Sequence, residues 1–128
     1  MRVIRIVLPL AIVLLAFGVS MADEEPQTFT GVYVWNEGGS DELSAEFSTT
    51  GEGTWDIKFR FRFAGNKGVW DGKAEGDLAD GGSISGTSGS SGRNWVFSAT
   101  IEDGVMRGTH AEIKGDKQED TGTFELKR

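Results

Sequence analysis

The chain has 128 residues, a formal net charge of −7, one histidine and no cysteine. Without cysteine it can form no disulfide and cannot carry the lipidated cysteine of a lipoprotein. One histidine without cysteine cannot supply a typical zinc site. The acidic charge repels polyanions and acidic membrane surfaces, so nucleic acid is not an expected partner.

The first 22 residues have the features of a secretory signal peptide. Arg2 and Arg5 form a basic start, residues 6–19 are apolar, and Ser20-Met21-Ala22 offers small residues to a signal peptidase. The apolar stretch is short for a membrane span, which makes an uncleaved anchor the weaker alternative. We therefore expect cleavage after Ala22, and residues 23–128 as one secreted or periplasmic domain without stable membrane insertion. Cleavage would remove two of the 13 basic residues and none of the 20 acidic ones, changing the formal charge from −7 to −9.

The rest of the chain alternates apolar and polar residues, as strands with one buried face do. The alternation is clearest in the segment 54–63, whose apolar residues are Trp55, Ile57, Phe59, Phe61 and Phe63. The expected strands are 28–35, 42–48, 54–63, 69–78, 83–88, 93–101, 105–113 and 120–127.

The turns between these strands predict their register. Asp103-Gly104 is a strong signal for a two-residue hairpin turn. The other expected turns lie at Thr50-Gly51-Glu52, Asn66-Lys67, Asp80-Gly81-Gly82 and Ser90-Ser91. The expected cross-strand pairs are Phe47 with Trp55, Phe63 with Trp70, Leu78 with Ile84, Gly86 with Trp95, and Ile101 with Met106. In this register all aromatic residues after position 22 share one face.

Eight hairpin-linked strands predict an all-β fold, a small up-and-down antiparallel barrel. Closure by pairing the first strand with the last removes both exposed edges, and an even strand number allows it. Inward glycines at positions 72, 76, 86, 108 and 122 would relieve crowding in a strongly curved barrel. A two-sheet β-sandwich is the alternative.

This strand count and order resembles the small secreted binding barrels of the avidin and lipocalin kind. Gly31-Val32-Tyr33 is similar to the Gly-x-Trp of their first strand, while the rest of either family's motif is absent. The resemblance implies a lipocalin-like architecture, and a shared fold does not by itself assign a function.

Several large residues are expected to face inward at one end of the barrel. An aromatic mouth of this kind suits a small apolar or aromatic ligand, because flat rings give a large contact area with few rotamers to freeze. His110 and Glu112 share the inward face and would orient that ligand. The predicted ligand-binding residues are Trp35, Trp70, Trp95, Tyr33, His110 and Glu112. The alternatives are rings that fill the barrel and a solvated His110–Glu112 rim pair.

No catalytic or metal-binding motif is recognisable, so we expect no catalytic residues, no metal and no cofactor. The stretch 82–86 places Ile84 where Gly-x-Ser-x-Gly needs its serine, so a hydrolase would rest on His110 alone. The acidic loops 36–42 and 116–120 lack the EF-hand spacing.

Two functions follow: an exported soluble binding barrel, or a filled, non-catalytic envelope or secreted scaffold. The scaffold would act through its acidic loops or an outer face at Val32, Val34 and Val96. An outer-membrane barrel is a third alternative, and it would place the polar His110 and Glu112 against lipid, which is costly.

Overall fold

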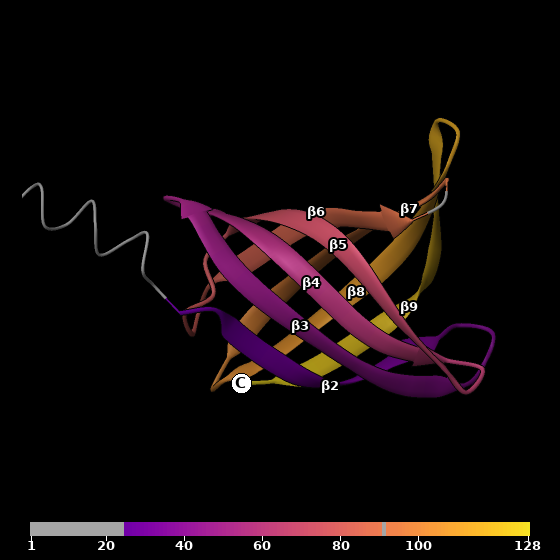
Figure 1. The fold of residues 1–128 in the computed structure, drawn as a ribbon, viewed down its shortest axis with the longest axis horizontal. Helices are drawn as coiled ribbons and strands as arrows, with labels where there is room; N and C mark the ends of the chain where they lie inside the picture. Colours follow the sequence, from indigo (N-terminus) through magenta and orange to yellow (C-terminus); the bar gives the residue numbers. More distant parts are fainter. Residues whose placement is uncertain (1–24, 91) are drawn as a thin grey trace, which may run out of the picture.

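The computed structural model describes residues 25–90 and 92–128, which form one closed antiparallel β-barrel (Figure 1). Its strands are β2 (Gln27–Trp35), β3 (Ser40–Gly51), β4 (Thr54–Phe63), β5 (Asn66–Gly76), β6 (Ser83–Ser90), β7 (Arg93–Glu102), β8 (Val105–Lys114) and β9 (Lys117–Lys127). They follow one another around the barrel in chain order, and β2 pairs with β9 to close it. This confirms the predicted eight-stranded up-and-down barrel. The predicted signal peptide and its cleavage site lie outside the described residues. Within the described ranges, no helix is long and apolar enough to cross a membrane.

Inward glycines let the strands approach and bend. A Cβ atom at Gly86 would overlap the Lys73 carbonyl on the neighbouring strand, and one at Gly108 would overlap the Ser98 carbonyl. At Gly122 it would meet the Val34 carbonyl across the closing β2–β9 pair. Glycine is therefore required at these positions for the tight curvature of the barrel.

The predicted register is correct at one turn and wrong at four. Asp103-Gly104 pairs Ile101 with Met106 as expected. Phe63 pairs with Asn66 instead of Trp70, because the turn is Ala64-Gly65, whose residues have φ angles of 52° and 82°. The remaining observed pairs are Phe47 with Ile57, Ile84 with Gly76, and Gly86 with Phe97. At each of these four turns the observed register differs from the predicted one by an even number of residues, so each strand keeps the predicted face inward.

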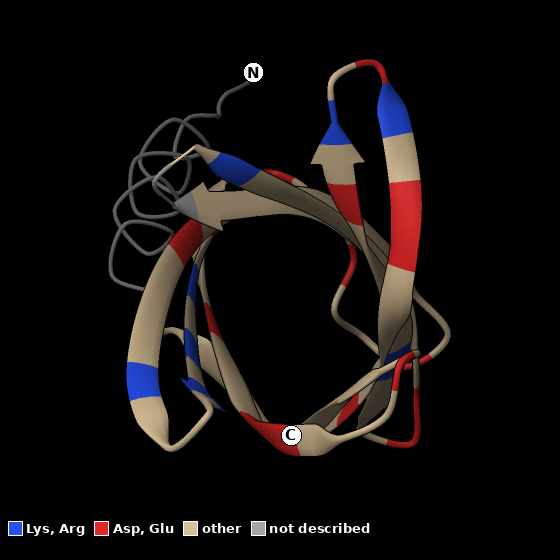
Figure 2. Ribbon diagram, turned by 90° about the vertical axis from the view of Figure 1, so that its right-hand side faces the viewer, with Lys and Arg blue, Asp and Glu red and all other residues tan. Residues whose placement is uncertain are grey.

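The outer face of β3, β4 and β5 carries paired charges. Lys73 Nζ lies 2.8 Å from Asp56, and Lys58 Nζ lies 3.2 Å from Asp71. These side chains are largely exposed, so each pair contributes little to stability. Figure 2, viewed from the end that bears the β2–β3 and β4–β5 turns, shows charged positions along the barrel wall and in the projecting β8–β9 hairpin.

The other end, which we call the packed end, carries the β3–β4, β5–β6 and β7–β8 turns. Its interior holds the largest fully buried side chains of the described residues, namely Phe29, Phe47, Leu78, Ile101, Met106 and Leu126. Arg128 covers this core from outside: it donates to the Leu78 carbonyl at 2.7 Å, and its guanidinium lies 4.7 Å from the centre of the Phe29 ring. The packed end is therefore filled by side chains.

Candidate functional site

The opposite end, which we call the aromatic end, contains a cavity of about 520 Å³. Its aromatic lining residues are Tyr33, Trp35, Phe59, Phe61, Phe63, Trp70, Trp95, Phe97 and Phe124, and its polar ones include Glu37, Ser88, Arg93 and His110. Two other hollows, of about 610 and 570 Å³, lie on the outer face and are lined mainly by charged residues, serine and threonine. The cavity at the aromatic end is thus the apolar one.

Trp95 on β7 is the centre of the aromatic lining. Its ring stacks on Trp70 of β5, with centroids 5.8 Å apart and an interplanar angle of 27°. Trp35 of β2 meets Trp95 edge-on at 5.7 Å. The three predicted tryptophans therefore come together, bracing one another while bordering the cavity. Such arrangements of aromatic pairs are favourable in themselves.

Small inward residues on β5 and β6 leave the room for this cavity. Gly68 lies so close to the Phe61 ring that a Cβ atom there would clash with it, and Gly72 lies beside the Phe59 ring. Ser88 is the inward residue of β6 at this level and pairs with Trp95. Trp70 lies between these two glycines on β5, and the small residues around it leave space beside the rings.

Phe63 and Tyr33 mark the rim and the wall of the cavity. Phe63 is 56% exposed, yet its ring lies 6.1 Å from that of Trp35. Tyr33 is buried, and its hydroxyl donates to the Arg62 carbonyl. Burial, with a smaller contribution from the Asp41 charge, raises the Tyr33 pKa. The phenol therefore stays neutral and links β2 to β4.

His110 lines the cavity beside Trp35, with ring centroids 5.3 Å apart. Its Nε2 lies 3.1 Å from the Val34 carbonyl and its Nδ1 lies 2.7 Å from Thr121 Oγ1. Because a carbonyl only accepts, Nε2 carries the hydrogen, and in the neutral ring Thr121 donates to Nδ1. Burial lowers the His110 pKa, which favours this neutral form.

A β-bulge creates the His110 site. His110 pairs with Gly122 and Ala111 pairs with Asp120, which leaves Thr121 as an extra residue on β9. The Thr121 hydroxyl also lies 3.0 Å from the His110 carbonyl. If the ring gains a proton, Nδ1 donates to Oγ1, and the hydroxyl can turn to donate to that carbonyl. The histidine is therefore held in place in both protonation states.

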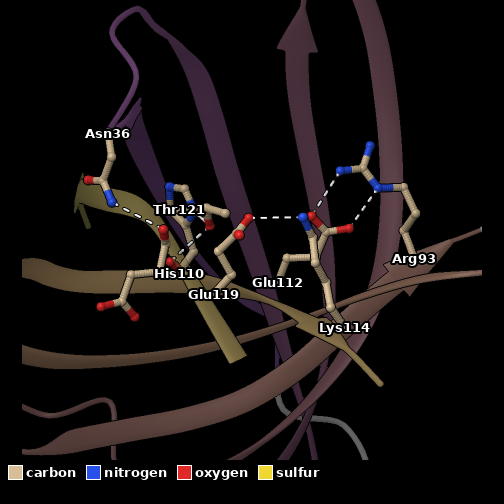
Figure 3. A network of polar contacts seen from close by, with 8 residues as sticks. Asn36, Arg93, His110, Glu112, Lys114, Glu119 and Thr121 are labelled. Carbon is tan, nitrogen blue, oxygen red and sulfur yellow. Dashed lines mark hydrogen bonds and ion pairs between the residues drawn. The ribbon is translucent and has the colours of Figure 1, made fainter. Parts of the chain in front are cut away.

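Glu112 forms an ion pair with Arg93, a residue that the sequence prediction did not include (Figure 3). Arg93 donates twice to the Glu112 carboxylate, from Nε at 3.0 Å and Nη2 at 3.1 Å. These hydrogen bonds lower the Glu112 pKa and raise the Arg93 pKa. His110 binds Thr121 and Val34 instead, so the predicted His110–Glu112 pair is replaced by two separate sets of contacts.

Arg93 also borders the cavity, and its guanidinium lies 5.2 Å from the centre of the Trp95 ring. The lining contains five of the six predicted site residues; Glu112 lies behind Arg93 and supports it. Arg93 precedes Trp95 by two residues on the same strand, so strand alternation alone could have identified it.

Within residues 25–90 and 92–128, no group of three histidine or acidic side chains could hold a metal ion. No protein family, curated protein or solved structure matches this chain.

Proposed function

We propose that this protein is an exported, non-catalytic binding barrel that holds a small apolar or aromatic molecule at its aromatic end. The observation that carries the proposal is the cavity of about 520 Å³ bordered by Trp35, Trp70 and Trp95. This volume is within the range of small-molecule sites, roughly 300–1,000 Å³, which are also mostly apolar with a few fixed polar groups.

The fixed polar groups support the same proposal. Tyr33 and His110 are already held by hydrogen bonds to backbone or side-chain partners, so little conformational entropy would be lost when a ligand arrives. The ring stack of Trp70 and Trp95 is likewise formed without a ligand. The exposed charge pairs of the outer face support a barrel that works in water.

A titration with 2-naphthol, a neutral flat aromatic probe, tests the proposal. Tryptophan fluorescence should change saturably, and the melting temperature should rise with probe concentration. Trp95→Ala should weaken binding by about 1–3 kcal/mol, the scale of one lost large apolar contact.

Trp55 offers a matched control because it lies toward the packed end, next to Phe47, and donates to the Gly76 carbonyl at 3.1 Å. Trp55→Ala should lower stability and leave the affinity for 2-naphthol unchanged. Absence of any saturable response, together with a Trp95→Ala variant that loses only stability, would favour the filled scaffold instead.

Export is tested separately from binding. The intact mass of the processed protein should correspond to a chain that begins near Asp23. Recovery of the full-length chain only in a detergent-soluble fraction would contradict the proposed export.

A further inference from the structure

The floor of the cavity at the aromatic end is built from phenylalanine side chains. Phe97 and Phe124 line the cavity and also belong to the buried core that continues into the packed end. Their ring centroids lie 6.2 Å apart, and Phe59, which lines the cavity as well, meets Phe97 edge-on at 5.6 Å. Because a phenylalanine ring has no hydrogen-bonding atom, the side chains of the floor offer a ligand only carbon surface.

The polar side chains in the wall of the cavity are already engaged within the chain. Tyr33 and Ser88 each donate their hydroxyl hydrogen to a backbone carbonyl, and both ring nitrogens of His110 have partners. The indole nitrogen of Trp95 is fully covered by the chain, so a ligand cannot reach it. A polar ligand group buried at this depth would lose its water without gaining an equivalent partner, which is costly.

The mouth of the cavity, in contrast, is polar and open to water. Glu37 of the β2–β3 turn and Arg93 at the start of β7 both line it, Glu37 is exposed, and the Arg93 side chain is 61% exposed. Along β7 the inward residues therefore change from Arg93 at the mouth, through Trp95, to Phe97 at the floor. The polarity of the cavity falls along its depth.

We propose that the ligand is an amphiphile whose polar groups are confined to one end. Its apolar end lies on the floor formed by Phe59, Phe97 and Phe124, and its polar end lies at the mouth in contact with water. The mouth carries charges of both signs, so the cavity selects the position of the polar group and not its charge. This inference rests on the proposed binding function and adds the orientation of the ligand and the distribution of its polar groups.

Two isomers with the same ring system and the same groups test this inference on the full chain. 2,3-Dihydroxynaphthalene carries both hydroxyl groups at one end, whereas 2,6-dihydroxynaphthalene carries one at each end and must bury one of them against the floor. Isothermal titration calorimetry should give the 2,3-isomer an affinity at least about tenfold higher, the scale of one unpaired buried hydroxyl.

The outcomes separate this inference from the binding function. Equal affinities, tighter binding of the 2,6-isomer, or binding of 2-naphthol without either isomer would overturn the inference and leave the binding function intact. If 2-naphthol and both isomers fail to bind, the proposed function fails and this inference fails with it.

Two substitutions on β4 locate the effect, because each adds one hydroxyl group to a phenylalanine of the cavity lining. Phe59→Tyr places it at the floor, so the affinity of the 2,6-isomer relative to the 2,3-isomer should rise about threefold to tenfold, the scale of one new hydrogen bond. Phe63→Tyr places it at the exposed rim and is the control, which should leave this ratio unchanged. An unchanged ratio in Phe59→Tyr, or an equal change in both variants, would overturn the assigned orientation. If Phe59→Tyr does not fold, the comparison of the two isomers on the unaltered chain decides.

Discussion

The two ends of the barrel are built from the same alternation of inward and outward residues, yet one is filled and the other is hollow. At the packed end Phe47 and Ile101 are 1% and 0% exposed. At the aromatic end Trp35, Phe61 and Trp70 are only partly buried and border the cavity. Inward orientation therefore does not decide whether a strand position becomes core.

The size of the opposing residues makes the difference. The packed end receives bulky side chains from several strands, including Met106 and Leu126, and Leu78 from the β5–β6 loop. At the aromatic end the inward residues on either side of Trp70 are Gly68 and Gly72, and β6 contributes Ser88, so space is left beside the rings. In a barrel of this width, a few small residues on adjacent strands suffice to open a ligand-sized space.

Replacing one phenylalanine at each end tests this contrast with the largest expected effect. Phe47→Ala at the packed end should cost about 3–5 kcal/mol of the free energy of unfolding, because it leaves a buried cavity. Phe61→Ala at the aromatic end should cost about 1–2 kcal/mol, since its ring is already partly exposed. Urea denaturation of both variants measures the difference, and equal losses would mean that the two ends are packed alike.

Closure of the barrel beside the aromatic end depends on Gly122. Gly122→Ala should cost about 1–3 kcal/mol, because the new methyl group meets the Val34 carbonyl and the His110 ring. Gly51→Ala is the control: its added Cβ meets only the Thr54 hydroxyl and should cost under about 1 kcal/mol. A loss for Gly122→Ala no larger than for the control would show that the closing strands relax easily.

The sequence predicted the facing of the strands better than their pairing. Burial of one face fixes register only to an even number of residues, so Phe63 could pair with Asn66 or with Trp70 without changing faces. The turn then decides, and a tight turn with Ala64 at positive φ is not indicated by residue type. Asp103-Gly104 was predictable because its turn chemistry is specific.

The candidate site was predictable in its rings and less so in its polar groups. The inward orientation of Trp35, Trp70 and Trp95 and their positions near one set of turns were enough to predict that they line the same end of the barrel. The contacts of His110 depend on the bulge at Thr121, where an extra residue interrupts the alternation of inward and outward side chains along β9. No alternation rule indicates where such an extra residue is inserted.

The smallest expected effect is the dependence of stability on pH. The only histidine of the chain, His110, lies at the aromatic end. Burial lowers the His110 pKa below its value of 6.5 in the unfolded chain. The unfolded state therefore binds this proton first, and the stability that His110 contributes is complete above about pH 6.5 and is lost as the pH falls through the folded-state pKa. His110→Gln should remove this part of the pH dependence of the melting temperature, and the decline at lower pH, where the Arg93-bound Glu112 gains its proton, should remain. An NMR titration of the His110 ring protons with a midpoint above pH 6.5 would contradict the burial of this ring in the wall of the cavity.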